Sequence, residues 1–580
     1  MIRRNYLLFS AVGIFISGGL ALQAQDFERY APKPVDAPPP AQSEGDETTA
    51  PTESVLDDSP LIAALEGVVI RDEAGDVVSG SVQAEGVLAS ENPLTQTDAF
   101  RALFEPYLGE PVSLASLDQM SREIVRYFRV NDRPIVDIGV PEQDITNGVV
   151  QVVVVEGRYG EARTEGNQHF SDSVFLRQLR LQPGEPIDSR RLLRDVSWMN
   201  MNPFRSVQPV FAPGGVAGET DVVLRVQDRF PVRVYTGYEN SGNELTGEDR
   251  WLFGLNWGNA FGLDHQLNYQ YTTSDDFSTV QAHTVSYFAP LPWRHTLQVY
   301  AGYTESEVGV TPFDLEGSST QAGVRYTIPL PTTSNYTHEV FTGFDWKQSD
   351  NSLIFGIIPV TDTTTEIGQF VFGYRGGMPD RFGSTSGEIS LIASPGGIFS
   401  NQTEADYNAV RPGAEDAYQY GIIRLDRITR LPFAFTLANE FIYQWSDENL
   451  LPSEQMSFGG YNSIRGYEER ELNNTDEGWI LRTELRTPAI SPLKMMGVQV
   501  DDELQLLGFW DYGHASASSG DVIRSDGTTA DNVRMSSAGP GLRYRLNTWL
   551  SARIDYGFQL SDNANSPTNG RWHIGIVASY

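Results

Sequence analysis

The stretch from Leu550 to Gln559 reads LSARIDYGFQ and alternates without a break between its two faces. The apolar positions are Leu550, Ala552, Ile554, Tyr556 and Phe558, and the opposite positions are Ser551, Arg553, Asp555, Gly557 and Gln559. Successive side chains of a β-strand point to opposite faces of the sheet. The stretch therefore predicts a strand with one apolar, aromatic-rich face and one face that carries charge.

The same alternation recurs from Phe230 to the end of the chain, in segments of about ten residues. Candidate strands lie near residues 231, 250, 264, 278, 295, 318, 337, 363, 384, 417, 432, 477, 503, 536, 549 and 571. About 16 strands of roughly 9–11 residues are typical of a single-chain bacterial membrane barrel. A soluble sandwich also alternates, so the alternation alone leaves both folds open. The aromatic apolar faces, the strand number, the signal-like N-terminus and the aromatic final residue favour a membrane β-barrel.

The last candidate strand runs to the final residue. Trp572, Ile574, Ile576, Ala578 and Tyr580 form its apolar face. A chain that ends on an outward aromatic residue resembles the C-terminal signal of outer-membrane proteins, in which Phe is commoner than Tyr. Tyr580 is therefore the predicted signal to the barrel assembly machinery, and outer-membrane lipid is the predicted surrounding of the barrel.

The N-terminus has the pattern of a secretory signal peptide. Arg3 and Arg4 supply the positive start, residues 6–22 form the apolar stretch, and small residues follow. We predict cleavage after Ala24, with cleavage after Ala21 as an alternative. An uncleaved membrane anchor is the other interpretation of the apolar stretch.

Composition excludes several classes of function. The chain of 580 residues has no cysteine, which excludes disulfides, a thiol nucleophile, cysteine zinc sites and a lipoprotein anchor. A net charge of −34 argues against nucleic acid as a partner, because phosphates need Lys and Arg. The histidines show no zinc-type spacing, and nucleophile-elbow and phosphate-loop motifs are missing. We predict no enzyme, no cofactor and no metal; His514 beside Asp511 is the one pair to check for hydrolysis.

The region between the signal and the barrel divides into a linker and two α+β units. Residues 25–60 are rich in proline and acidic side chains and predict a disordered linker. In the first unit Ser113 caps a predicted helix over 114–129, and in the second Asp188 caps a helix over 189–201. The predicted domains are a signal peptide (1–24), the linker (25–60), two small α+β domains (61–157 and 158–229) and the barrel (230–580).

The longest connection near the end of the chain spans about residues 446–477 and carries GGYNSIRGY at 459–467. Long loops without structure of their own are usually functional or disordered. Arg465 lies near the tip of this loop. Two strands later, FWDYG at 509–513 alternates so that Asp511 faces the lumen, and Glu484 and Arg486 share that inward parity.

These positions predict a loop that folds back into the barrel. A guanidinium inside a barrel needs a charged partner, and a bidentate contact between Arg465 and Asp511 provides one. The alternative is a surface arginine in a turn and an aspartate that lines a water-filled lumen.

Two motifs resemble those of the POTRA–barrel outer-membrane superfamily. IRGY at 464–467 resembles its Val-Arg-Gly-Tyr/Phe loop motif, and Phe-x-Asp-x-Gly at 509–513 resembles its partner motif on the thirteenth strand. The residues that carry the resemblance are Ile464, Arg465, Gly466, Tyr467, Phe509, Asp511 and Gly513. With two POTRA-like units ahead of the barrel, the chain resembles the two-partner secretion transporters of the hemolysin-activator type.

The resemblance implies that Arg465 and Asp511 form a loop–barrel lock that holds the loop in a transport-competent position. It implies an outer-membrane transporter, with its POTRA domains in the periplasm, that exports a large β-rich partner protein without ATP. The POTRA domains are expected to bind that secreted partner, since an exposed sheet edge can accept a strand. The alternatives are a POTRA–barrel insertase, which usually has more POTRA units, a passive porin, which has none, and a barrel hydrolase.

Two features depart from the family pattern. Residues 72–93 predict an insertion in the first POTRA domain. Some family members carry an N-terminal helix that plugs the pore. Residues 25–60 contain too many prolines to predict such a helix clearly.

Overall fold

A computed structural model describes residues 29–35, 57–216, 218–310, 313–332, 335–355, 358–517, 522–523, 529–530, 532–561 and 570–580. The chain forms two compact units, residues 37–229 and residues 1–36 with 230–580. The predicted signal peptide and most of the predicted linker lie outside the described residues. No helix within the described residues is both long and apolar enough to cross a membrane.

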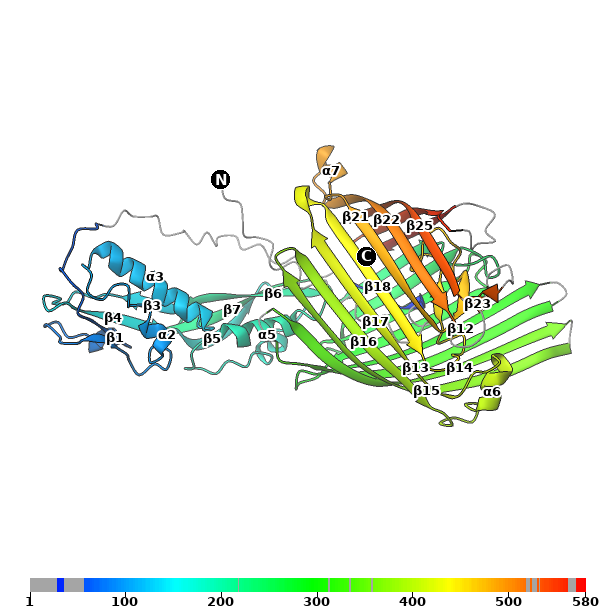
Figure 1. The fold of residues 1–580 in the computed structure, drawn as a ribbon, viewed down its shortest axis with the longest axis horizontal. Helices are drawn as coiled ribbons and strands as arrows, with labels where there is room; N and C mark the ends of the chain where they lie inside the picture. Colours follow the sequence, from blue (N-terminus) through cyan, green and yellow to red (C-terminus); the bar gives the residue numbers. More distant parts are fainter. Residues whose placement is uncertain are drawn as a thin grey trace. The chain divides into compact units, whose positions relative to one another are not determined.

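The second unit is a closed antiparallel barrel (Figure 1). In the described residues its sixteen strands are β8 (Val232–Glu239), β9 (Arg250–Ala260), β10 (His265–Thr273), β11 (Val280–Pro290), β12 (Thr296–Val310), β13 (Phe313–Pro329), β14 (Thr337–Phe355), β15 (Ile358–Asp380), β16 (Gly383–Pro395), β17 (Ala417–Arg430), β18 (Thr436–Ser446), β21 (Glu477–Arg486), β22 (Asp502–Ser516), β25 (Asn532–Leu546), β26 (Leu550–Gln559) and β27 (Gly570–Ser579). Each predicted strand lies in or next to one of them. The predicted fold class is therefore confirmed.

The connections between barrel strands carry short elements. They are α6 (Glu404–Val410), η3 (Pro432–Ala434), β19 (Met456–Phe458), β20 (Leu472–Thr475), α7 (Pro492–Met495), β23 (Val522–Ile523) and β24 (Thr529–Ala530). β27 closes the barrel on β8, from the pair Gly575–Glu239 to the pair Ser579–Tyr235. The first and last strands of the barrel are thus direct neighbours.

The barrel has its apolar face outside and its polar face inside. On β22, Trp510 is 42% exposed whereas its neighbour Asp511 is fully buried. Other exposed large apolar side chains along the strands are Trp251, Phe253, Ile389, Leu391, Leu425, Phe558 and Trp572. Such a surface is unfavourable in water and suits lipid. In a soluble sandwich the outer face is polar. The apolar outer face and polar inner face seen here therefore identify a membrane barrel.

The first α+β domain has a four-stranded sheet covered by helices. Its strands, in the order β2-β1-β4-β3, are β2 (Gly86–Leu88), β1 (Gly67–Arg71), β4 (Val149–Glu156) and β3 (Val136–Gly139), and its helical elements are η2 (Ala74–Asp76), α2 (Asp98–Arg101) and α3 (Leu114–Val130). Ser113 caps α3 by accepting a hydrogen bond from the backbone of Ser116. Met120, Ile124 and Phe128 recur at helical spacing and are buried in the core. β2 lies within the predicted insertion and adds an edge strand parallel to β1.

The second α+β domain repeats the arrangement with a three-stranded sheet. Its elements are β5 (Arg158–Glu165), α4 (Asp172–Leu176), α5 (Ser189–Met199), β6 (Arg205–Pro213) and β7 (Glu219–Asp228), with sheet order β5-β7-β6. Asp188 caps α5 by accepting a hydrogen bond from the backbone of Arg191. Leu192, Val196 and Met199 form its buried face. Two POTRA-like units therefore precede the barrel in the sequence.

Candidate functional site

The connection between β18 and β21, residues 447–476, turns back into the barrel; we name it the inward loop. Its strands β19 and β20 pair as a short hairpin. Gly459 and Gly460 have φ angles of 98° and 107°, a region that glycine adopts readily. Ile464 and Tyr467 are fully buried in an apolar cluster with Phe458 of the same loop and residues of the barrel wall such as Ile480 and Met535. The loop tip is thus packed rather than exposed.

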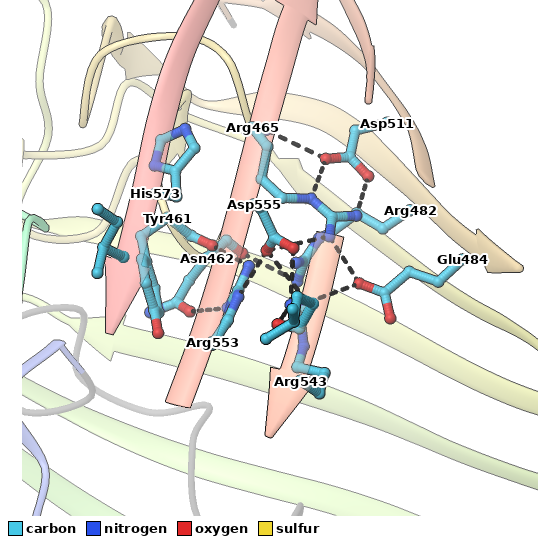
Figure 2. Close-up of polar contacts among 12 residues, drawn as sticks. Tyr461, Asn462, Arg465, Arg482, Glu484, Asp511, Arg543, Arg553, Asp555 and His573 are labelled. Carbon is cyan, nitrogen blue, oxygen red and sulfur yellow. Dashed lines mark hydrogen bonds and ion pairs between the residues drawn. The ribbon is translucent and has the colours of Figure 1, made fainter. Parts of the chain in front are cut away.

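Arg465 at the tip contacts Asp511 through three hydrogen bonds (Figure 2). Its Nε donates to Oδ2 at 2.7 Å, its Nη2 donates to Oδ1 at 2.8 Å, and its backbone N–H donates to Oδ2 at 3.1 Å. Both side chains are fully buried. The contact is the bidentate fork that arginine makes best and lysine cannot reproduce.

The remaining Nη1 of Arg465 reaches two further carboxylates. It donates to Glu484 on β21 at 2.6 Å and to Asp555 on β26 at 3.4 Å. Three other arginines complete the shell: Arg486 contacts Glu484, Arg543 contacts Glu484 and Asp555, and Arg553 contacts Asp555. Every charge in this cluster therefore has an opposite charge beside it. Removing one member leaves its partners buried and unbalanced, which is the costly case.

The other motif residues shape the seat of the loop tip. The guanidinium carbon of Arg465 lies 3.6 Å from the ring centroid of Phe509, a cation–π contact. A side chain at Gly513 would collide with Ile464 and Phe458, so the position admits only glycine without displacement. The Tyr467 hydroxyl bonds the backbone oxygens of Ser536 and Ser561. The structure thus brings all seven motif residues together.

Other candidate residues are not brought together. Asp511 faces the lumen while His514 packs against Trp479 on the outer face, so this pair forms no catalytic dyad. Tyr580 is 96% exposed and makes backbone hydrogen bonds with Val234.

Only one feature of the sequence points to the rest of the charge cluster. Asp555, Arg543 and Arg553 all lie on the inward parity of their strands, like Asp511. Many residues that face the lumen share this parity. Only the position of the loop tip in the structure shows that these three belong to the cluster around Arg465. His573 and Gln559, which bond the backbone of Gly466, were missed for the same reason.

Residues 29–35, within the predicted linker, contact the inner wall of the barrel. The Lys33 ammonium lies 2.6 Å from the carboxylate of Glu239, and the Tyr30 carbonyl accepts hydrogen bonds from Gln270 and Thr284. Tyr30 is buried against Val280 and Ala282. These contacts join residues more than 200 positions apart, which local composition does not predict.

The connection between β16 and β17, residues 396–416, covers another part of the wall. Tyr407 of α6 is fully buried with Leu450 and Leu451 in an apolar cluster. The Nη2 of Arg411 donates to Asp476, at the end of the inward loop, at 2.7 Å. The two connections are therefore joined by an ion pair whose carboxylate is buried.

Comparison with known families and structures agrees with this fold. The model of the haemolysin secretion/activation protein family ShlB/FhaC/HecB matches residues 218–539, and the ShlB-type POTRA domain model matches residues 82–157. The heme/hemopexin transporter protein HuxB of Haemophilus influenzae is 22% identical over 504 residues, which cover 85% of this chain and 86% of that protein. The outer membrane transporter CdiB-2 of Burkholderia pseudomallei strain 1026b is 22% identical over 508 residues, 84% of each protein.

A solved structure has the same fold. CdiB from Escherichia coli superposes with a TM-score of 0.70 at 17% identity, covering 96% of this chain and 95% of that one. The resemblance read from the motifs is confirmed, and because the family model spans more than half of the sequence, the chain belongs to the haemolysin secretion/activation protein family ShlB/FhaC/HecB.

Proposed function

We propose that the protein is the outer-membrane transporter of a two-partner secretion system, which exports a large β-rich partner protein to the cell surface. The buried contact of Arg465 with Asp511, inside a barrel of this family, carries the proposal. A loop exposed on the protein surface would leave its arginine in water, whereas this loop buries a guanidinium among three carboxylates. HuxB and CdiB-2 are named as transporters, which supports the same function.

The proposed mechanism starts from a barrel that is occupied at rest. Residues 29–35 and the inward loop each cover part of the inner wall, and residues 396–416 are joined to the inward loop by the ion pair of Arg411 with Asp476. The partner must displace some of these segments to pass through the lumen. Folding of the partner outside the cell would prevent its return and would drive export without ATP.

Strand addition at a POTRA sheet edge is the proposed way in which the partner docks, and the edge β6 is closed to it. Pro209 and Pro213 lack the N–H groups that a ladder needs. The side chain of Asn200 donates to the Val207 carbonyl and accepts from the Val207 N–H. Two of the outward N–H groups of β6 are missing and a third is occupied, so we infer that the partner uses another edge.

β3 of the first POTRA domain is an open edge. Within the described residues it pairs only with β4. The Gly157 N–H donates to the Ile135 carbonyl, so Ile135 faces β4 and the alternate positions Val136, Ile138 and Val140 face outward. The start of β5, by contrast, is covered by bonds between Tyr159 and residues 184–185. We infer that an extended segment of the partner adds to β3.

Removal of the protein from its cells separates transport from the insertase alternative. The transporter predicts that the partner, tested as the large exported protein encoded beside this chain, stays in the periplasm while other outer-membrane barrels keep their normal abundance. General loss of outer-membrane barrels would support the insertase and contradict the transporter. Restoration by the wild-type chain is the control.

A further inference from the structure

The backbone of Gly466, next to Arg465, has its own binding site on the last two strands of the barrel. Its N–H donates to Nε2 of His573 on β27 at 2.9 Å, and its carbonyl accepts from Nε2 of Gln559 on β26 at 2.8 Å. Figure 2 shows His573 beside Tyr461, on the side of the site away from Asp511. The loop tip is therefore held on two sides by different strands.

Gly557 completes this site by leaving room for the loop backbone. A Cβ at Gly557 would lie 2.5 Å from the nitrogen of Gly466, and a Cβ at Gly466 would lie 2.7 Å from the carbonyl oxygen of Gly557. Real Cβ atoms do not approach that closely, so the two glycine backbones touch directly. Gly466 also has a φ of 90°, which disfavours other residues there.

His573 provides the hydrogen-bond acceptor for the Gly466 N–H, and it does so as an uncharged imidazole in a closely packed site. It is 1% exposed, lies opposite Asp555 in the register of β26 and β27, and has the Tyr461 ring at its edge. An imidazole nitrogen accepts a hydrogen bond only when it carries no proton, so the bond assigns the proton to Nδ1. A glutamine could offer an amide oxygen in the same place, whereas leucine offers no acceptor.

We propose that His573, Gln559 and Gly557 are positioning residues that dock the loop tip independently of the charge cluster around Arg465. The proposal rests on the proposed role of the inward loop in transport. A buried N–H that loses its acceptor shifts a docking equilibrium about tenfold. The variant His573→Leu is therefore expected to raise the undocked fraction of the loop about tenfold, although Arg465, Asp511 and Glu484 are unchanged.

Thiol labelling measures docking directly, because the chain has no cysteine of its own. Ile464→Cys places one thiol at a fully buried loop position. In the purified full-length protein in detergent, with barrel folding checked by heat-modifiable gel mobility, a bulky maleimide reports how often the loop leaves. The expected labelling rate rises about tenfold with His573→Leu or Gly557→Ala and stays near the parent rate with His573→Gln.

Two matched controls lie on the outer face of β22. His514→Leu makes the same chemical change beside Trp479, and Gly508→Ala adds a methyl group where the surroundings are open. Both should label like the parent. The proposal is overturned if His573→Leu in a folded barrel labels like the parent, or if His573→Gln labels as fast as His573→Leu.

An Arg465→Ala arm separates this proposal from the proposed function. If Arg465→Ala blocks secretion of the partner while His573→Leu leaves Ile464→Cys protected, the positioning role fails and the transport role stands. If Arg465→Ala secretes normally, the transport role of the loop fails whatever the labelling rates.

Discussion

At the scale of single residues, Arg465 makes two kinds of contact that no other type of amino acid can combine. Its planar guanidinium forms a fork on Asp511 and at the same time stacks on the ring of Phe509. Lysine has the charge but neither the fork nor the flat face. The identity of the residue, and not its charge alone, therefore sets the stability of the docked loop.

Arg465→Lys should loosen the loop without breaking the barrel. The lysine keeps one contact with Asp511 and loses the second hydrogen bond and the stacking, at a cost of roughly 1–3 kcal/mol. Planar-bilayer recording should show more frequent openings than with the wild type. The same change at Arg545, which pairs with Glu503 at an exposed site, should have no effect. Identical traces for Arg465→Lys and wild type would refute this account of the fork.

Gly513→Ala tests the packing below the loop tip. Its methyl group would meet Ile464 and Phe458, and overpacking of this kind costs typically 1–3 kcal/mol. We expect a lower unfolding temperature of the barrel, followed by circular dichroism. Gly508→Ala, on the same strand in open surroundings, is the control and should leave that temperature unchanged. An unchanged unfolding temperature for Gly513→Ala would contradict the packing argument.

At the scale of elements, strict alternation was sufficient to place the strands and to orient Asp511, because a strand has a fixed period of two. The docked loop could also be inferred, because a guanidinium that enters a lumen needs a partner. Sequence could not show that residues 29–35 bind the wall, since their partners Glu239 and Gln270 lie on distant strands. It could not select Asp555 or His573 among the many inward side chains, because that choice depends on how the barrel closes.

The open edge of β3 leads to a prediction at this scale. Val140→Pro removes an outward N–H at an exposed position, and each lost main-chain hydrogen bond is worth about 0.5–1.5 kcal/mol. Affinity of the full-length protein for its partner should therefore fall about tenfold in a pull-down titration. Phe211→Pro makes the same change on the closed edge β6, between two existing prolines, and should bind normally. Equal affinities for both variants and the wild type would exclude β3 as the docking edge.

At the scale of the whole molecule, segments of the chain itself occupy part of the barrel lumen. Residues 29–35 and the inward loop come from different parts of the sequence and contact different strands, and residues 396–416 bind the inward loop through Arg411. Because the barrel belongs to the haemolysin secretion/activation protein family, we propose that these segments move when a partner passes. Within the described residues none of these segments is a strand of the closed barrel sheet, so each can be displaced without unfolding the wall.

Weakening the contacts of residues 29–35 should open the lumen. Tyr30→Ala with Lys33→Ala removes a buried ring, worth roughly 1.5–3 kcal/mol, and the ion pair with Glu239. We expect a several-fold rise in the mean current across planar bilayers. Lys494→Ala, which breaks an exposed pair with Asp501, should leave the current unchanged. No rise in a correctly folded double variant would show that these residues do not obstruct the lumen.

The most direct test of the central claim is secretion of the partner by cells that carry either wild-type protein or Arg465→Ala, with Arg545→Ala as the control. Surface amounts of the partner are measured beside heat-modifiable mobility of the barrel. The account predicts a partner outside the cell with wild type and Arg545→Ala, and a partner trapped in the periplasm with a folded Arg465→Ala barrel. Normal secretion through a folded Arg465→Ala barrel would contradict it.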